Sequence, residues 1–269
     1  MIHVEDLGDH GRVRLVTIDR QERRNALDHD ALEGLLAAID GAPRTDAIGS
    51  APAAGAPTGG GRHDATRVLV LRGAGGHFCA GADLSGVEDP SFVALLNRVL
   101  NGLRDAPFPT IAAVDGAALG AGTQLAVACD LRTATEDATF GIPAAKLGLM
   151  VDQWTIQRLV TIAGQGPARA MLLAALTYSG AEAFSFGLVQ RLGPVEDTLA
   201  WAEQIATLAP LTIAGHKVGL NETENGGALP GDGPTPIYQA VFTRAWGSDD
   251  LQEGLAAFRE RRPADFQGR

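Results

Sequence analysis

The stretch PTIAAVDGAALGAGTQLAVACDLRTAT, residues 109–135, alternates between two kinds of pattern. Its first part, residues 109–116, is an apolar run that predicts a buried strand. Two glycines then open residues 120–129, a run of small apolar residues that predicts a buried helix, and residues 131–135 predict a further strand. Strands that alternate with helices in this way predict an α/β protein with a parallel-type core.

The segments on either side repeat this alternation. Residues 12–20 and 67–73 predict strands, and the buried strand 67–73 needs the first one beside it. Residues 27–40 predict a helix that places these apolar side chains on one face: Leu27, Ala31, Leu32, Leu35 and Ile39. Further along, the patterns predict helices near 153–163 and 167–176, and a short strand with a turn at 187–193.

Two parts of the chain stand apart from the predicted core. Residues 41–66 are dominated by Gly, Ala and Pro, so they can bury little and are expected to form a mobile surface insertion. From Val195 the pattern is helical, with a Gly/Pro-rich interruption at 226–236. We therefore predict a core over residues 1–194 and a helical region over 195–269.

Composition excludes several classes of protein. The chain has 22 Lys and Arg against 32 Asp and Glu, a net charge of −10, so it is a poor candidate for binding nucleic acid. It contains no apolar run of the roughly 18 to 20 residues that span a bilayer, and its charged N-terminal stretch is unlike a signal peptide. Cys79 and Cys129, in apolar surroundings, are predicted to be reduced and buried. These features predict a cytoplasmic protein without a metal site.

The glycines at 120 and 122 match neither common phosphate-binding motif. A dinucleotide fingerprint needs a third glycine where this chain has Leu125, and a P-loop needs a lysine where it has Thr123. A strand, a tight turn and a helix N-terminus remain, and such an N-terminus can bind a negatively charged oxygen. The small residues of GGHFCAGADLSG (75–86) offer a second loop of this kind. Spacing leaves open the alternative that both loops serve close helix–strand packing.

Six segments, in order along nearly the whole chain, resemble the crotonase family, also called the enoyl-CoA hydratase/isomerase family. The segments are RNALD (24–28), FCAGADL (78–84), PTIAAVDGAALGAGTQLAVACDLR (109–132), KLGL…TIQRL (146–159), GLV (187–189) and SDDLQEGLAAFRERRPADF (248–266). Only the insertion 41–66 and the loop 223–236 lie outside the resemblance.

The resemblance implies a crotonase-like spiral of ββα units with a C-terminal helical trimerisation region. It implies a fatty acyl-CoA or enoyl-CoA ligand, no cofactor beyond that thioester, and a homotrimer or a hexamer built as a dimer of trimers. The two oxyanion donors would be the backbone N–H groups of Ala82 and Ala121, the latter at a position where the family usually has Gly. Other ligand-contacting positions would be Arg24, Ala26, Ala80, Asp83, Leu84, Gly120, Gln124, Ala144 and Phe258, the last reaching a neighbouring subunit's ligand.

The residues that hydration requires are missing from this sequence. Hydratases of the family use two glutamates, and the matching positions here hold Gln124 and Ala144. Neither side chain can give or take a proton, and each missing acid or base typically costs about 10²–10⁴ in rate. Asp152 stands where some family members carry a catalytic aspartate. It is expected first to cap the helix that follows it, with catalysis or a polar contact to the ligand as alternatives.

Three functions therefore compete. The favoured one is an acyl-CoA-binding protein of fatty-acid metabolism, with an intact oxyanion hole and weak or no hydratase activity. The second is an enoyl-CoA isomerase or acyl-CoA hydrolase that uses Asp152. The third is an enoyl-CoA hydratase in which Gln124 or a nonstandard group positions the water.

Four other residues carry structural expectations. His77 is expected on a surface loop, and Asp130 at the end of a helix. Trp154 is expected to pack in the fold, although it could line an acyl tunnel. Lys217 is expected to be a solvated helix lysine, with a contact to a CoA phosphate as the alternative.

Overall fold

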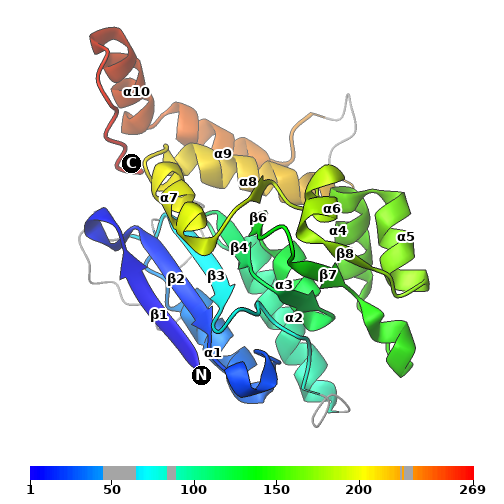
Figure 1. The fold of residues 1–269 in the computed structure, drawn as a ribbon. Coiled ribbons are helices and arrows are strands. Elements are labelled where there is room, and N and C mark those ends of the chain that lie inside the picture. The colour runs from blue at the N-terminus through cyan, green and yellow to red at the C-terminus, as the bar shows by residue number, and fades with distance from the viewer. Residues whose placement is uncertain (45–64, 84–88, 225, 227–232) are drawn as a thin grey trace.

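A six-stranded sheet organises the chain (Figure 1). The computed structural model describes residues 1–44, 65–83, 89–224, 226 and 233–269. The strand order is β1-β2-β3-β4-β6-β9, in which β1 pairs antiparallel with β2 and the other neighbours are parallel. The strands are β1 (Ile2–Leu7), β2 (Val13–Ile18), β3 (Val68–Gly73), β4 (Thr110–Val114), β6 (Leu131–Ala134) and β9 (Arg191–Leu192).

Both faces of this sheet are buried, as is usual for parallel strands. Alternate residues along β2, β3 and β4 point to opposite faces and enter two separate apolar cores. One face is covered by helices α1 (His29–Asp40), α2 (Pro90–Asp105) and α3 (Ala121–Ala128). The opposite face is covered by α7 (Val195–Ala206), whose Ala202 and Ala206 are buried against it. The helix α7 thus packs on the sheet although it follows the predicted boundary at residue 194.

A second, three-stranded sheet gives the fold its repeat. It contains β5 (Ala117–Leu119), β7 (Thr139–Gly141) and β8 (Thr177–Ser179), with β5 parallel to β7 and β7 antiparallel to β8. The chain passes from β4 to β5 and then α3, and next from β6 to β7 and then, through a 3-10 helix, to α4 (Gln153–Ala163). The predicted spiral of ββα units is therefore confirmed.

The remaining helices complete the molecule. They are α5 (Gln165–Leu173), α6 (Gly180–Ser185), α8 (Pro210–Glu224), α9 (Pro236–Trp246) and α10 (Asp249–Glu260), and short 3-10 helices cover Asp9–Gly11, Gln21–Arg23 and Pro143–Leu147. Figure 1 shows α8 and α9 side by side above the sheet, while α10 projects from the body. Close packing of α8 on α9 depends on Gly219, because a Cβ there would lie 2.8 Å from the Tyr238 ring. The elements β1, β5, β7, β8, α2 and α6 were not predicted from the sequence pattern.

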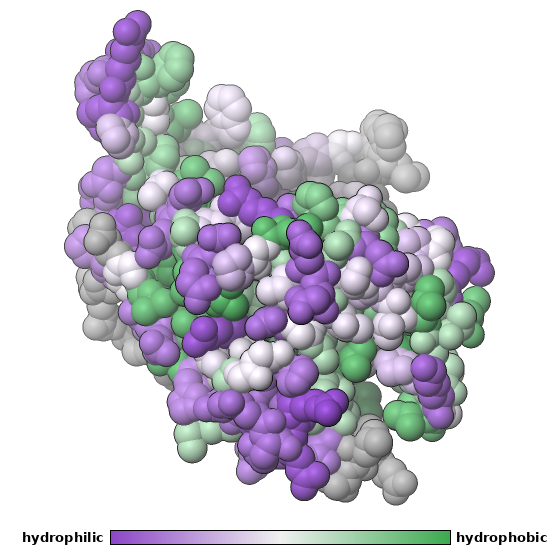
Figure 2. Space-filling model, viewed as in Figure 1, coloured by the Kyte–Doolittle hydropathy of each residue, from purple (hydrophilic) through white to green (hydrophobic). Residues whose placement is uncertain are grey.

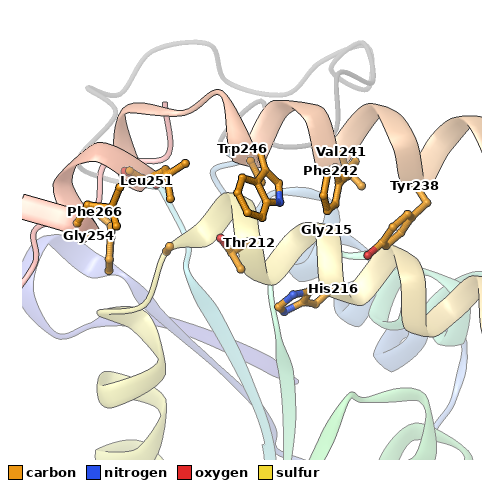
Figure 3. A pocket seen from close by; sticks show the side chains of 14 residues that line it. Thr212, Gly215, His216, Tyr238, Val241, Phe242, Trp246, Leu251, Gly254 and Phe266 are labelled. Carbon is orange, nitrogen blue, oxygen red and sulfur yellow. The ribbon is translucent and has the colours of Figure 1, made fainter. Parts of the chain in front are cut away.

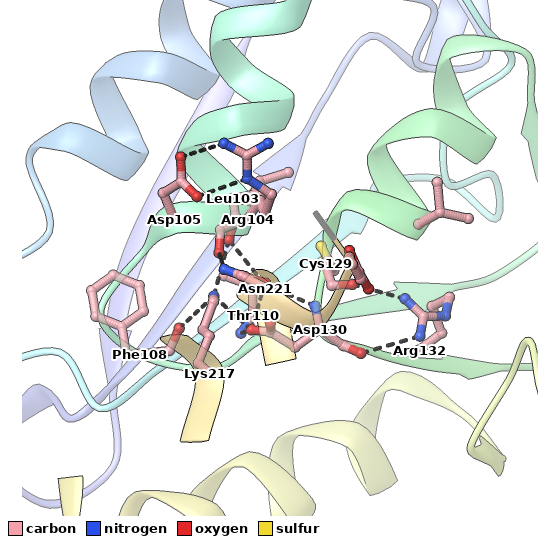
Figure 4. Close-up of polar contacts among 12 residues, drawn as sticks. Leu103, Arg104, Asp105, Phe108, Thr110, Cys129, Asp130, Arg132, Lys217 and Asn221 are labelled. Carbon is pink, nitrogen blue, oxygen red and sulfur yellow. Dashed lines mark hydrogen bonds and ion pairs between the residues drawn. The ribbon is translucent and has the colours of Figure 1, made fainter. Parts of the chain in front are cut away.

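Lys217 corrects one prediction (Figure 4). Its side chain is buried, at 6% exposure, and its Nζ donates to the carbonyls of Leu103 at 3.1 Å and Phe108 at 3.0 Å, and to Asp130 Oδ2 at 2.7 Å. A lysine has three donors, and all three are used. The expectation of a solvated lysine is therefore wrong, and so is the alternative of a CoA phosphate contact. Asp130 lies two residues after the last residue of α3, next to its C-cap Cys129, at the helix end as predicted.

The hydrophilic surface and the two buried cysteines fit the composition of the chain. Figure 2 shows hydrophilic side chains spread over the visible face, with hydrophobic residues in small separate patches. Among the described residues, no helix is both long and apolar enough to cross a membrane. Cys79 and Cys129 are free and fully buried, as predicted, and burial raises the pKa of each thiol to about 12. Both are therefore protonated at neutral pH.

The insertion predicted at 41–66 falls largely on residues 45–64, which lie outside the described residues. Its two ends meet, because the Thr66 amide donates to the Pro43 carbonyl at 2.9 Å. Replacing residues 45–64 by a short Gly/Ser linker is expected to change the free energy of unfolding by about 1 kcal/mol or less, since loop-closure entropy depends weakly on length. Chemical denaturation checks this. A loss of several kcal/mol would show that the segment packs on the fold.

Candidate functional site

The small-residue loop after β3 and the turn before α3 lie against each other. The Cys79 amide donates to the Ala117 carbonyl at 2.8 Å, and the Leu119 amide donates back to the Cys79 carbonyl at 3.0 Å. Further along both segments, a Cβ on Gly120 would lie 3.9 Å from the Gly81 Cα. Ala82 and Ala121 each follow these glycines by one residue, so the two predicted donor positions are held on adjoining loops.

Three glycines make this approach possible. Gly81 has φ +115° and Gly120 has φ +52°, conformations that a side chain would strain. Gly122 is needed for space, because a Cβ there would lie 2.0 Å from the Cys79 carbonyl oxygen. Gly120 and Gly122 are therefore required for α3 to start beside the other loop.

The amides of Ala82 and Ala121 have no hydrogen-bond acceptor among the described residues. Leu27 pairs with the first loop, since its amide donates to the Gly81 carbonyl at 2.8 Å and its carbonyl accepts from Asp83 at 2.7 Å. In this parallel pairing the Ala82 amide points away from Leu27. Ala121 begins α3, where the first amides have no acceptor within the helix. Neither amide donates to any described residue, and two such donors can bind an oxygen that carries negative charge.

The opposite end of α3 carries buried positive charge. Arg132 donates to the carbonyls of Ala126 at 3.1 Å and Cys129 at 2.8 Å, and Arg158 Nε donates to the Val127 carbonyl at 2.9 Å. Burial lowers the pKa of Arg132 to about 10, so it remains protonated at neutral pH. Cations at the C-terminus complement the helix dipole, whose positive end lies at the amides of the site.

The predicted ligand-contacting positions of the N-terminal half meet at one edge of the site. The Arg24 carbonyl accepts from the Ala80 amide at 3.0 Å, and the Arg24 side chain is exposed. Ala26 directly precedes Leu27, the residue paired with Ala82. Asp83 is partly buried. Leu84 lies outside the described residues.

Two residues that organise this edge were not predicted. Asn25 is fully buried, and its Nδ2 donates to the carbonyls of Ala74 at 2.8 Å and His77 at 2.6 Å. Arg20 Nη2 lies 2.7 Å from Asp28 and 3.6 Å from Asp83. The segment RNALD contains Asn25, but its partners lie about fifty residues away in sequence, so spacing gave no signal of this role.

Gln124 and Asp152 form a polar cluster one helical turn beyond Ala121. Gln124 is 6% exposed, and its Nε2 donates to Asp152 Oδ2 and to Thr155 Oγ1, both at 2.9 Å. Asp152 Oδ1 accepts from the Thr155 amide at 2.9 Å, and its Oδ2 also accepts from Thr155 Oγ1 at 2.6 Å. Asp152 is therefore the N-cap of α4, which confirms the first expectation for it. Thr155 was not predicted as part of this cluster.

The other predicted residues lie in three different settings. Ala144 is half-buried, three residues after Gly141, whose carbonyl accepts from the Gly120 amide at 2.9 Å. Trp154 packs against the core, as expected, with the Arg104 guanidinium 5.7 Å from its ring centre. Phe258 is 85% exposed on α10, which projects away from α3 in Figure 1, so one chain does not bring it to the site.

A hollow of about 430 Å³ lies elsewhere, between α8, α9 and α10 (Figure 3). The side chains of Tyr238, Phe242 and Trp246 line it, together with His216 from α8. Its lining includes neither loop of the site. We therefore place the candidate chemistry at the loop junction. The described residues contain no cluster of His, Cys, Asp and Glu that could hold a metal ion.

Comparison with known proteins agrees with the class that this architecture defines, the crotonase fold. A solved enoyl-CoA hydratase/carnithine racemase from Magnetospirillum magneticum superposes with a TM-score of 0.82 at 26% identity, over 100% of this chain and 96% of that one. An enoyl-CoA hydratase from Bacillus anthracis gives a TM-score of 0.80 at 28% identity, over 100% of this chain and 99% of that one.

Sequence comparison gives the family. The family model described as enoyl-CoA hydratase/isomerase matches residues 61–269. A probable enoyl-CoA hydratase of Mycobacterium tuberculosis is 40% identical over 95% of this chain and 96% of its own length. The 2,3-dehydroadipyl-CoA hydratase of Escherichia coli is 32% identical over 96% of each chain. The chain belongs to the enoyl-CoA hydratase/isomerase family, as the resemblance of its motifs predicted.

Proposed function

We propose that this protein binds fatty acyl-CoA or enoyl-CoA thioesters in fatty-acid metabolism and hydrates them weakly or not at all. The thioester oxygen would accept hydrogen bonds from the Ala82 and Ala121 amides, which have no acceptor among the described residues. Arg24, Ala26, Ala80 and Asp83 would border the ligand at the adjoining edge. The proposed site needs no cofactor besides the thioester itself.

The single observation that carries the proposal is that Gln124 cannot transfer a proton and that the Asp152 carboxylate is hydrogen-bonded to Gln124 and Thr155. Hydration needs one group that takes a proton and one that gives a proton. Gln124 does neither, and Ala144 has no functional group. The Asp152 carboxylate already accepts three hydrogen bonds, from Thr155 N, Thr155 Oγ1 and Gln124 Nε2. These bonds occupy three of the roughly four acceptor sites of the carboxylate and hold the side chain at the start of α4, which disfavours Asp152 as the base of an isomerase or hydrolase.

The proposal extends to assembly and location. Large apolar side chains on the C-terminal helices are exposed, among them Leu220 at 67%, Trp246 at 64% and Phe258 at 85%. Exposed apolar side chains in such numbers fit an interface between subunits, here a homotrimer or a dimer of trimers. In such an assembly Phe258 would contact a neighbouring subunit's ligand. The two reduced cysteines fit the cytoplasm.

Calorimetric titration tests the binding. Saturated acyl-CoAs of about four to sixteen carbons are expected to bind, and a ligand at a hundredfold excess over its dissociation constant stabilises the fold by about 2.7 kcal/mol. Crotonyl-CoA, followed by the loss of its conjugated absorbance, is expected to be hydrated at least about 10²-fold more slowly than by a two-glutamate hydratase. Absence of binding by every acyl-CoA would overturn the proposal. Efficient hydration that Asp152→Asn abolishes would instead make Asp152 the catalyst.

A matched pair of variants tests the Ala121 amide. Ala121→Pro removes the N–H at the first position of α3, where proline is well tolerated, and Ala121→Gly keeps the N–H. Loss of one hydrogen bond is expected to weaken acyl-CoA binding about three- to tenfold in the proline variant and little in the glycine variant. A folded proline variant with unchanged affinity would exclude this amide from the site.

A further inference from the structure

Three unpaired polar atoms gather where strands β2 and β3 begin. Among the described residues, the fully enclosed side-chain atoms without a hydrogen-bond partner are Arg12 Nε, Thr66 Oγ1 and Arg67 Nη1. They lie on paired backbone, because the Arg67 amide donates to the Arg12 carbonyl at 2.8 Å and Thr66 directly precedes Arg67. Thr66 is 3% exposed and Arg67 is 5% exposed. Buried polar groups without partners are rare and costly, so three at one place indicate a missing partner.

The same place holds two arginines that no carboxylate pairs with. Within the part of the chain that the structure describes, neither Arg12 nor Arg67 forms an ion pair. Burial lowers the pKa of Arg67 and the nearby charge of Arg12 lowers it further, whereas Asp250 and Asp265 raise it. The Asp250 carboxylate is already occupied, because it accepts from two backbone amides of the C-terminal tail, residues 263–269.

The unpaired atoms are donors of the kind that bind oxyanions. An arginine Nη1 carries two N–H groups and an Nε carries one, while a threonine hydroxyl carries one O–H. Guanidinium groups match the oxygens of phosphate in geometry, and two of them balance the charge of a divalent anion. Arg12 is only half-buried, so its side chain is the one that can move aside to admit an ion.

This cluster lies at the opposite end of the sheet from the candidate thioester site. The loop that contains Gly81 follows β3, whereas Thr66 and Arg67 precede it, and six residues of extended strand span about 20 Å. The cluster instead contacts the C-terminal tail, since Arg67 Nη2 donates to the Phe266 carbonyl at 2.8 Å. Figure 1 shows the end of the chain returning from α10 toward the body of the molecule. A partner that holds the Arg67 guanidinium would therefore also hold the tail.

We propose that Arg12, Thr66 and Arg67 form a site for one small inorganic oxyanion, phosphate or sulfate, which fastens the C-terminal tail to the start of β3. The ion accepts from Arg67 Nη1, Arg12 Nε and Thr66 Oγ1, while Arg67 Nη2 keeps its bond to the Phe266 carbonyl. Because the three atoms are enclosed, the substituent of a phosphate monoester has no exit, so the site takes the free ion. The site is independent of the proposed function.

Equilibrium dialysis of the intact protein against radiolabelled phosphate tests the site. About one phosphate per chain is expected to bind. Unlabelled sulfate should displace it, whereas chloride at equal ionic strength and glycerol 3-phosphate should not. Phosphate at a hundredfold excess over its dissociation constant is expected to raise the Tm by about 5 °C relative to sodium chloride. Absence of bound phosphate, or its displacement by glycerol 3-phosphate, would overturn the inference and leave the acyl-CoA titrations unaffected.

Two variants locate the bound ion. Thr66→Val removes only the hydroxyl, and Arg12→Gln removes a charge and the Nε donor. Each is expected to weaken phosphate binding about tenfold or more. Without phosphate, their Tm should be unchanged or higher, because an unpaired group or a repulsion is gone, whereas a purely structural role would lower it. The general stabilisation of proteins by phosphate persists in both variants.

Arg98→Gln is the matched control, since it removes an exposed arginine of α2. It is expected to leave phosphate binding unchanged. Full phosphate affinity in both Thr66→Val and Arg12→Gln would place the ion elsewhere and overturn the inference. If a variant fails to fold, the stoichiometry and ion selectivity of the natural protein decide.

Discussion

Replacing Gly122 by alanine is expected to cost about 3 kcal/mol of folding free energy and most of the acyl-CoA affinity. The new methyl would lie 2.0 Å from the Cys79 carbonyl oxygen, a backbone atom that cannot rotate away. Overpacking of a buried contact typically costs about 1–3 kcal/mol, and here the start of α3 must move. That movement would separate the Ala82 and Ala121 amides. Chemical denaturation and acyl-CoA titration measure the two effects.

Ala121→Gly is the control for this substitution. It lies one residue earlier, changes the same methyl group in the opposite direction and keeps every backbone amide. A small effect on both measurements is expected for the control. If Gly122→Ala retained normal stability and affinity, close contact of the two loops would not be a condition for the site.

Restoring both glutamates is expected to give the largest change in rate. The variant with Gln124→Glu and Ala144→Glu should hydrate crotonyl-CoA at least about 10²-fold faster than the natural protein, because each proton-transfer group typically contributes about 10²–10⁴. Either substitution by itself should give little, since the reaction would still lack one partner. The loss of conjugated absorbance measures the rate.

The structure adds a condition to this experiment. A carboxylate at position 124 would face Asp152, which lies 2.9 Å from the present Gln124 Nε2, and two carboxylates so close repel each other and share a proton. Adding Asp152→Asn to the double variant removes this repulsion and is expected to raise the rate further. A folded, ligand-binding triple variant that remains inactive would show that the pocket lacks more than two glutamates.

Most of the regular elements could be predicted because each is long enough to show its own period. The helix predicted at 153–163 has the observed bounds, and the strand predicted at 67–73 begins one residue later, at Val68. The strands β5, β7 and β8 could not be predicted in this way, because each has three residues and exists through pairing with the others. The helix α2 is different. Its buried residues have helical spacing, so the sequence itself carries the signal for this helix.

The residues of the candidate site also fall into two groups, those that the local sequence indicates and those whose roles depend on distant parts of the chain. Small residues at Gly81 and Gly120 indicated where backbone amides could be exposed, because that property is local. The roles of Asn25 and Lys217 depend on carbonyls that the fold brings from far along the chain. For Lys217 these lie 109 and 114 residues away, so local pattern favoured a solvated lysine and gave the wrong result.

Because Lys217 and Arg158 join α8 to α3, the candidate site is expected to bind its ligand only after α8 has folded. Lys217 joins α8 to Asp130, just beyond the C-cap of α3, and Arg158 joins the last turn of α3 to Glu224 at the end of α8. Separating α8 from the fold would leave Asp130 and Arg158 without their charged partners on α8. The helices α8 and α3 are therefore expected to unfold together as one cooperative unit. A chain still emerging from the ribosome, or cut before residue 217, would carry every loop of the site and yet lack the support that holds α3 in place. If the proposed function holds, such a chain is expected not to bind a thioester.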